Sequence, residues 1–381
     1  MNTKIISHNF AERSFNPQRL AEAREAKGLT MAELARVLDI SRQAISSFEK
    51  GIKAPSHETL MTLSKVLGFP ERFFVSSHSS PEIKGAVHFR SRATATKKAR
   101  MSGRARGRWV SLILQECSKY AQLPPVILPD LDIIDFESLE KSDIEEIATA
   151  VRRYWQLGDG PIVNLTKLLE NKGIVVSHLS SGEKVDAFSF WEGDRPVVIL
   201  DKSKTAVRMR FSLAHELGHL IMHRTVEDDY LEDKQLFELV ESQADYFASC
   251  FLMPSNTFGR EYYSPSLSAL EQLKERWITS IGSITMRAHS LNIMSDNQKV
   301  YVFRQLAPYR RKEPLDDVIP KEKPQLLYKL LKLLDTHSIM KTSDLIDIFG
   351  LPITDLSAIT QLSESELTQG DNIISFVLRG K

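Results

Sequence analysis

Residues 214–223 read AHELGHLIMH, a stretch with two histidines four residues apart. On a helix, His215 and His219 lie on one face, close enough for both imidazoles to bind one metal ion. Glu216 lies beside the first histidine, where it can reach a water molecule at that ion. Gly218 costs about 1 kcal/mol in a helix interior relative to alanine, so we expect another element to approach the backbone there. The pattern predicts a buried zinc-site helix, although so short a motif also arises by chance.

A catalytic zinc site needs a third protein ligand. His223 lies eight residues from His215, about 12 Å along a helix axis, which is too far for one ion. We expect it to pack in the core or lie on the surface, or alternatively to support a ligand without binding the ion itself. Residues 238–254, ELVESQADYFASCFLMP, offer a better candidate. Glu241 would supply an oxygen ligand, and Asp245, one turn later, would accept the N–H of a ligand histidine. The alternative is that both acids are ordinary surface charges on an amphipathic helix.

A second motif lies near the N-terminus, where residues 29–68 read LTMAELARVLDISRQAISSFEKGIKAPSHETLMTLSKVLG. Thr30 and Ser41 are expected helix N-caps ahead of apolar residues at helical spacing. Short helices joined by short turns are typical of a helix-turn-helix module, whose second helix reads base edges in the major groove. The predicted DNA-binding residues are Ser41, Arg42, Gln43, Ser46, Ser47 and Lys50. The alternative is that the module serves only for protein contacts.

This stretch resembles the phage-repressor (XRE) type of helix-turn-helix. The matching elements are Ala35, Ile40-Ser41 at the turn, Ile45, and Glu49-Lys50-Gly51. Met31 stands where the family often has glutamine, so one backbone contact of that family is in doubt. Asp39 stands where glycine is usual, but aspartate tolerates the left-handed conformation better than most residues. We therefore expect the fold to form despite both departures.

The histidine helix also belongs to a wider pattern. Residues 208–223, RMRFSLAHELGHLIMH, followed by residues 241–254, resemble the ImmA/IrrE-type zinc metallopeptidases, which have a gluzincin-like core. The resemblance extends upstream to residue 152 and downstream to Glu313-Pro314, roughly half of the chain. It implies that Zn²⁺ is held by His215, His219 and Glu241, with Glu216 as the general base of peptide hydrolysis. Asp245 occupies a position where the family commonly has asparagine or another small polar residue, so its supporting role is less secure.

Three strands are expected between the predicted helices, in GIVVSHL at 173–179, VDAFSFW at 185–191 and RPVVILD at 195–201. The last is expected to be an edge strand on which an extended substrate pairs through its backbone. Near the C-terminus, residues 372–379, NIISFVLR, are also strand-like.

Composition narrows the class of protein. The 381 residues are 42% hydrophobic and 26% charged, without an apolar run long enough to cross a bilayer. Two cysteines and the lack of a signal-peptide pattern favour a cytoplasmic protein without a disulfide scaffold. Residues 84–108 contain no acid, whereas residues 130–146 are strongly acidic. The basic segment either binds an anionic partner such as nucleic acid, faces the acidic segment, or is simply solvated.

The expected fold class is mainly α with a small sheet (α+β). Its parts are an all-helical helix-turn-helix domain, a gluzincin-like metallopeptidase domain and a helical C-terminal region. The expected boundaries are 1–77 for the DNA-binding domain, which we expect to fold alone, 78–141 for a largely helical connecting region, 142–313 for the peptidase domain and 314–381 for the C-terminal region.

These expectations together suggest a DNA-binding transcriptional regulator with a zinc endopeptidase that cleaves a repressor-like protein. The alternative is a non-proteolytic repressor or antitoxin whose metal domain is a sensor or scaffold. The expected partners are double-stranded DNA, a protein substrate such as a co-encoded repressor or toxin, and a second copy of the chain in a homodimer. No membrane association is expected.

Overall fold

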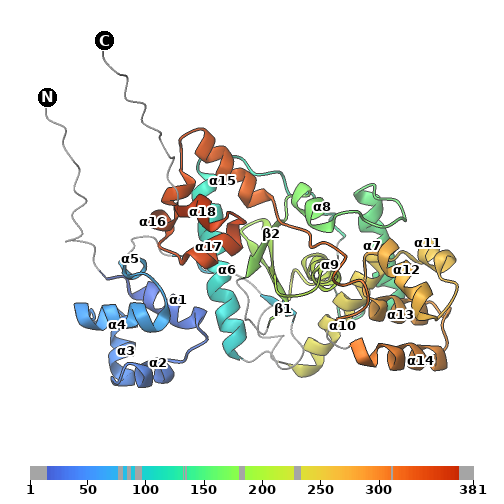
Figure 1. Cartoon of the computed structure of the whole chain (residues 1–381), viewed down its shortest axis with the longest axis horizontal. Helices are drawn as coiled ribbons and strands as arrows, with labels where there is room; N and C mark the ends of the chain where they lie inside the picture. Colours follow the sequence, from blue (N-terminus) through green and yellow to red (C-terminus); the bar gives the residue numbers. More distant parts are fainter. Residues whose placement is uncertain are drawn as a thin grey trace, which may run out of the picture. The chain divides into compact units, whose positions relative to one another are not determined.

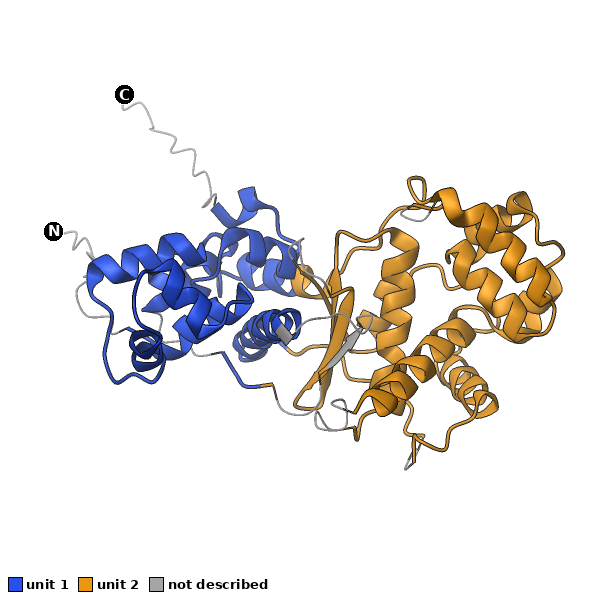
Figure 2. Cartoon of the chain, turned by 90° about the horizontal axis from the view of Figure 1, so that it is seen from below, with its two compact units in different colours: residues 1–82, 96–121, 330–381 blue, residues 83–95, 122–329 orange. Residues whose placement is uncertain are grey.

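The structure, a computed structural model, describes residues 15–75, 80–83, 87–90, 97–131, 133, 135–179, 185–226, 233–309 and 312–368. The strand-like stretch 372–379 lies outside these residues. The chain divides into two compact units, of which unit 1 comprises residues 1–82, 96–121 and 330–381, and unit 2 comprises residues 83–95 and 122–329 (Figure 2). Each unit therefore contains stretches that are distant in sequence. The four sequence-based domain boundaries stay predictions.

Unit 1 is helical (Figure 1). Its elements are α1 (Pro17–Ala26), α2 (Met31–Val37), α3 (Arg42–Glu49), α4 (His57–Leu67), α5 (Glu71–Phe74), α6 (Lys97–Ser118), the 3-10 turn η4 (Thr342–Asp344), α16 (Leu345–Phe349), α17 (Ile353–Thr360) and α18 (Glu364–Thr368). Helix α15 (Leu326–Thr336) begins in unit 2 and continues into unit 1. Thr30 and Ser41 cap α2 and α3 through their side chains, as the sequence predicts.

An aromatic cluster joins the stretches of unit 1. Trp109 of α6 is fully buried, and its ring centroid lies 5.7 Å from that of Phe69 and 6.3 Å from that of Phe73. Its indole N–H donates to Glu22 of α1 at 3.3 Å. From the C-terminal stretch, Gly350 packs so closely that an added Cβ would lie 3.1 Å from the Cα of Phe73. A fragment of residues 1–77 would lack these partners, so we no longer expect it to be a complete folding unit.

Unit 2 contains a small sheet with helices around it. Its strands are β1 (His88–Arg90), β2 (Val175–Leu179), β3 (Ala187–Glu192) and β4 (Arg195–Asp201), and its helices are α7 (Lys141–Tyr154), α8 (Leu165–Asn171), α9 (Ala206–Met222), α10 (Lys234–Leu252), α11 (Ser255–Glu261), α12 (Leu267–Trp277), α13 (Ile281–Ser290) and α14 (Asp296–Leu306), followed by the 3-10 turn η3 (Ala307–Tyr309). Helix α9 packs against β3 and β4, and α10 packs against α9 and α7. The expected α+β class is confirmed.

The strand order is β1-β3-β4-β2, with β3 antiparallel to both β1 and β4, and β4 parallel to β2. The three predicted strands are present, and β1 is a fourth that the sequence analysis missed. The prediction that RPVVILD forms a substrate-binding edge is wrong, because β4 is paired on both sides. Its continuous apolar run, Val197 to Leu200, is fully buried and is typical of an interior strand.

Within the described ranges, no helix combines the length and the apolar character needed to span a membrane.

Both cysteines, Cys117 and Cys250, are buried and form no disulfide with one another. Burial raises the pKa of the Cys117 thiol to about 12, so this side chain is an unreactive part of the core.

Candidate metal centre and DNA-reading helix

The metal centre depends on a close approach of α9 and α10 at Gly218. A Cβ added to this glycine would lie 3.0 Å from Cδ1 of Phe247 and 3.4 Å from the Cα of Ala244. No side chain fits there without displacing α10, so the expectation of a close approach is confirmed. Because Ala244 lies one turn from Glu241, the same contact brings the acidic face of α10 to the histidines of α9.

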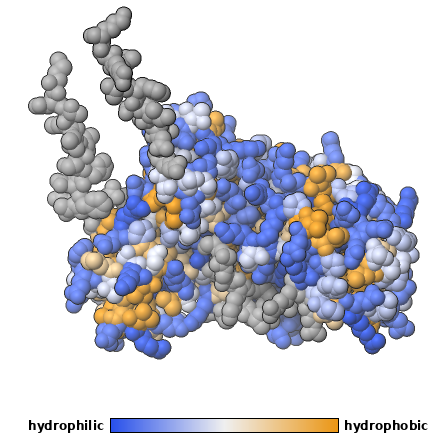
Figure 3. Space-filling model, in the orientation of Figure 1, coloured by the Kyte–Doolittle hydropathy of each residue, from blue (hydrophilic) through white to orange (hydrophobic). Residues whose placement is uncertain are grey.

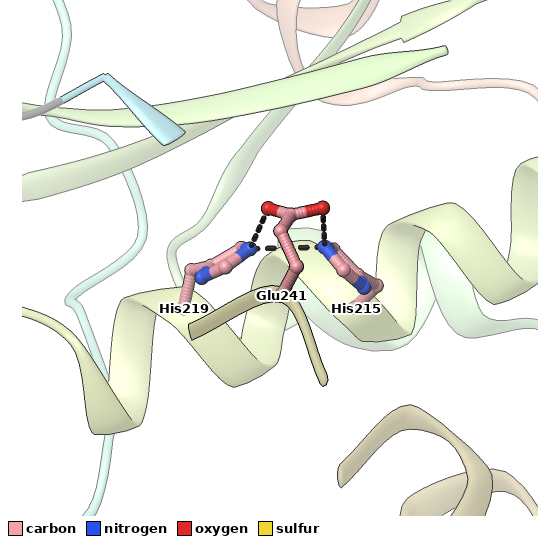
Figure 4. Close-up of side chains that lie close together, drawn as sticks. All are labelled: His215, His219 and Glu241. Atoms are coloured by element: carbon pink, nitrogen blue, oxygen red, sulfur yellow. Dashed lines mark hydrogen bonds and ion pairs between the residues drawn. The ribbon is translucent and has the colours of Figure 1, made fainter. Parts of the chain in front are cut away.

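His215, His219 and Glu241 converge on one point (Figure 4). The Nε2 atoms of the two histidines are 2.9 Å apart, and the Glu241 carboxylate lies 3.7 Å from the first and 3.3 Å from the second. Both histidines are fully buried. Among the described residues, these three form the group of side chains that could hold a metal ion. Two imidazoles and one carboxylate are a ligand set of catalytic zinc sites that leave a fourth position open, so the residues fit Zn²⁺.

The electrostatics of the centre favour a divalent cation. Burial opposes the charge on Glu241, but hydrogen bonds and charges from His215 and His219 outweigh it and hold its pKa well below the usual range. Burial lowers the pKa of His219, against the opposing effect of Glu241. A neutral imidazole and an ionised carboxylate are the forms that bind metal. With neutral imidazoles, the ionised Glu241 would give the ligand set a net negative charge, which favours a cation at this point.

Asp245 lies where a supporting group for His215 would stand. Its Oδ1 is 2.8 Å from Nδ1 of His215, on the side of the ring opposite Nε2. An N–H donated from Nδ1 to this carboxylate leaves the Nε2 lone pair directed toward Glu241 and His219. This is the arrangement expected of Asp245 from its spacing, one turn after Glu241.

His223 lies in a second chain of hydrogen bonds, in the supporting position that the sequence analysis left open as an alternative. Its Nδ1 is 2.9 Å from Nδ1 of His219, and its Nε2 is 2.9 Å from Oε1 of Gln243. The amide nitrogen of Gln243 donates to the carbonyl of Phe136 at 2.7 Å, so its oxygen faces His223 and accepts the Nε2–H. Nδ1 of His223 is then an acceptor for Nδ1–H of His219, whose Nε2 stays free for a metal. Burial lowers the pKa of His223 to about 3 and keeps it neutral.

We expect His223→Phe to weaken zinc binding by about 10–100-fold, the usual cost of losing a group that orients a ligand. Phenylalanine keeps a ring in the buried position, beside Phe136, but cannot accept the proton of His219. Competition with a chromophoric chelator measures the affinity. His289→Phe is the matched control, because His289 lies on α13 rather than on α9 or α10 and pairs with Asp296. Equal zinc affinity in His223→Phe and the unsubstituted chain would show that His219 is oriented without this partner.

Glu216 is fully buried on α9 and faces the sheet. Its Oε2 accepts a hydrogen bond from the hydroxyl of Ser189 on β3, at 2.6 Å. The sequence analysis missed Ser189, although a single serine between two phenylalanines in a buried strand (AFSFW) is the signal that could have found it. The contact gives Glu216 one defined orientation beside His215.

The predicted DNA-reading residues lie on and beside α3. Ser41 is the N-cap, and its hydroxyl accepts the backbone N–H of Ala44 at 3.1 Å. Ser41, Arg42, Gln43 and Lys50 are exposed, whereas Ser46 and Ser47 are half-buried. Two contacts hold α3 against the rest of the unit. Ile45 is fully buried, and the Arg24 guanidinium of α1 donates to both carboxylate oxygens of Glu49, at 2.6 and 2.9 Å. Glu49 is thus a structural residue of this unit.

Asp39 takes the left-handed conformation, with a φ of 52°, at the turn between α2 and α3. The expectation that aspartate could replace glycine there is confirmed. The surface over α2, α3 and α4 carries a hydrophobic area (Figure 3). Val37 of α2, Met61 of α4, and Ile52, which follows α3, are exposed.

Several basic side chains of α6 have partners inside unit 1. Lys98 pairs with Glu33 of α2, and Arg108 pairs with Glu25 of α1 at 2.5 Å. Arg106 is buried and donates to the carbonyl of Ala26 at 3.1 Å. These three residues hold helices of unit 1 together, a use of the basic segment that the sequence analysis did not consider.

Comparison with known proteins agrees with both motifs. Residues 20–74 match the family described as helix-turn-helix, and residues 169–289 match the family described as the IrrE N-terminal-like domain. The radiation response metalloprotease IrrE of Deinococcus radiodurans is 28% identical to this chain over 120 residues, which are 29% of this chain and 35% of IrrE. The chain thus covers about a third of that relative. The present chain carries a helix-turn-helix region of the phage-repressor type together with a region of the ImmA/IrrE metallopeptidase type.

Proposed function

We propose that the chain is a DNA-binding transcriptional regulator with an active zinc-dependent endopeptidase, whose substrate is a repressor-like protein. The observation that carries the proposal is the joint placement of a three-ligand centre and a buried carboxylate, Glu216, held by Ser189 at 2.6 Å. A site that only binds metal as a scaffold needs the ligands but has no use for an oriented carboxylate beside them.

In this proposal, bound zinc supplies Lewis-acid chemistry, by polarising the scissile carbonyl and acidifying water. His215, His219 and Glu241 would hold the ion, while Asp245 and His223 would orient the histidine rings. Glu216 accepts a proton from the attacking water, and the water oxygen adds to the carbonyl carbon. The carboxylate then delivers that proton to the leaving nitrogen as the C–N bond breaks. The products are a new carboxyl terminus and a new amine.

The cleavage is tested by incubating the zinc-loaded chain with the protein encoded beside it, with and without a chelator. Mass spectrometry should find two fragments of the partner that require zinc. An intact partner in both samples, together with tight binding between the two proteins, would instead favour the antitoxin or scaffold function.

We further propose that α3 reads a specific DNA duplex, with Arg42 and Gln43 at the base edges. Arginine matches guanine and glutamine matches adenine by bidentate hydrogen bonding. Arg42→Ala and Gln43→Ala are each expected to cost about 1–3 kcal/mol of discrimination at particular base pairs. Titration of the full chain against the operator and its single-base variants measures this. Lys65→Ala on α4 is the control, since Lys65 lies outside the predicted reading set. A loss from Arg42→Ala that is equal for all sequences would assign Arg42 to the phosphates.

Two proposals concern partners and location. Val37, Ile52 and Met61 are more than half exposed, at 58%, 70% and 51%, and we propose that they contribute to a homodimer on DNA. A contiguous exposed apolar area bordered by polar residues, such as the one over these helices (Figure 3), is typical of an interaction surface. We also propose a cytoplasmic location, which the DNA partner requires.

A further inference from the structure

The strand β1 covers one edge of β3. In the sheet order β1-β3-β4-β2, β3 has β4 on one side and β1 on the other. Within the described residues, only β1 therefore covers the side of β3 that faces away from β4. The pairing is antiparallel and spans three residue pairs, with His88 opposite Ser189 and Arg90 opposite Ala187. Val87, directly before the strand, is buried. A three-residue strand is at the short end of the usual range and forms few backbone hydrogen bonds.

This edge lies beside the catalytic machinery of the proposed peptidase. Ser189, the residue opposite His88 in the register, is the residue whose hydroxyl binds Glu216. The strand also contacts α9, the helix that carries His215 and His219. A polypeptide paired along this edge therefore runs past the carboxylate that would take up the proton.

The exposed edge of a sheet binds extended polypeptides through backbone hydrogen bonds, with little demand on their sequence. An endopeptidase whose metal-binding helix lies beside this edge would bind its substrate along it. We propose that β1 is a segment of the chain itself that occupies this peptide-binding edge of β3. An external peptide substrate, extended and antiparallel to β3, must then displace β1. The inference rests on the proposed peptidase function. It adds that a segment of the same chain competes with the substrate for the edge of β3.

The place of β1 in the sequence gives the exchange a consequence. Residues 83–95 belong to unit 2 but connect two stretches of unit 1, residues 1–82 and 96–121. A substrate that displaces β1 would therefore detach from the sheet the segment that links two stretches of unit 1.

The experiment uses the full, zinc-loaded chain with Glu216→Gln, so that peptides are bound but not cut. The probe is a fluorescein-labelled peptide of residues 83–95, IKGAVHFRSRATA, and its binding is read by anisotropy. Proline at a strand residue removes a backbone donor. Since alternate residues of an antiparallel strand make the hydrogen bonds, His88→Pro and Phe89→Pro are tested separately. At least one is expected to bind the probe at least ten times more tightly than the control Ile83→Pro, which lies outside β1.

A cross-link tests the opposite direction in a chain with an undisturbed strand. Arg90→Cys with Ala187→Cys places two cysteines at paired positions. The oxidised protein is expected to bind the probe at least ten times more weakly than the same protein after reduction with a phosphine. Of two probes, one with proline in place of His88 and one with proline in place of Phe89, at least one should not bind to any form. Equal affinity in the locked, reduced and proline-bearing proteins would overturn the proposal. Peptide exchange without cleavage of any protein by the unsubstituted chain would refute the peptidase function but support the peptide-binding edge.

Discussion

Glu216→Gln is expected to lower the rate of substrate cleavage by about 10²–10⁴-fold, the usual contribution of a general base. Glutamine has nearly the same shape as glutamate and can still accept the hydrogen bond of Ser189, but it cannot take a proton from water. Zinc should stay bound, because Glu216 is not a ligand in this proposal. DNA binding should be unchanged, because the predicted reading residues lie in unit 1. Cleavage, zinc content and operator affinity are measured on the same preparation.

Ser189→Ala is a graded companion to this variant. It removes the hydroxyl that orients Glu216 at 2.6 Å and leaves the carboxylate in place, so we expect a smaller loss of rate than for Glu216→Gln. In cells, regulation that survives Glu216→Gln but is lost in Arg42→Ala would mean that hydrolysis is dispensable. The non-proteolytic repressor would then replace the function proposed here.

Glu241→Ala is expected to weaken zinc retention by at least about 100-fold, since even the loss of a group that only supports a ligand costs about 10–100-fold. Alanine also leaves His215 and His219 without the carboxylate that both of them face. The measurement is zinc content after dialysis, followed by competition with a chelator of known affinity.

Glu238→Ala is the matched control for this experiment. Glu238 lies on the same helix, one turn earlier, but it is exposed and pairs only loosely with Lys234, at 3.7 Å. Its loss should leave the zinc content unchanged. If instead Glu241→Ala keeps its zinc and Glu238→Ala loses it, the third ligand has been assigned to the wrong residue.

The proposed ligands could be named from the sequence through periodicity within single helices, together with the resemblance to the ImmA/IrrE-type metallopeptidases, which implied Glu241. Four-residue spacing fixes which side chains share a face, and this placed His215 with His219 and Glu241 with Asp245. The same one-dimensional argument left the role of His223 open. It is too far along α9 to bind the same ion, yet it is one turn from His219 and can contact that residue directly. Distance from the ion excluded it as a ligand without excluding it as the partner of a ligand.

What the sequence could not supply is the placement of residues across elements. The order of strands is set by long-range pairing, so RPVVILD was taken for an edge although its apolar run is typical of an interior strand. Ser189 reaches Glu216 because β3 crosses α9, and no local pattern encodes that crossing. The basic residues of α6 illustrate the same limit, because Arg106 and Arg108 have partners on α1, about 80 positions earlier.

The discontinuity of unit 1 also sets an order of events during synthesis. The helix-turn-helix residues leave the ribosome early, but α16–α18, which complete their unit, follow only after residues 122–329 have been made. At about 5–20 residues per second, that interval lasts on the order of tens of seconds. The metal-binding helices therefore emerge, and can acquire zinc, before the DNA-binding unit is complete. In a nascent chain, the residues of the proposed zinc site would therefore all be present before the unit that is proposed to bind the operator is complete.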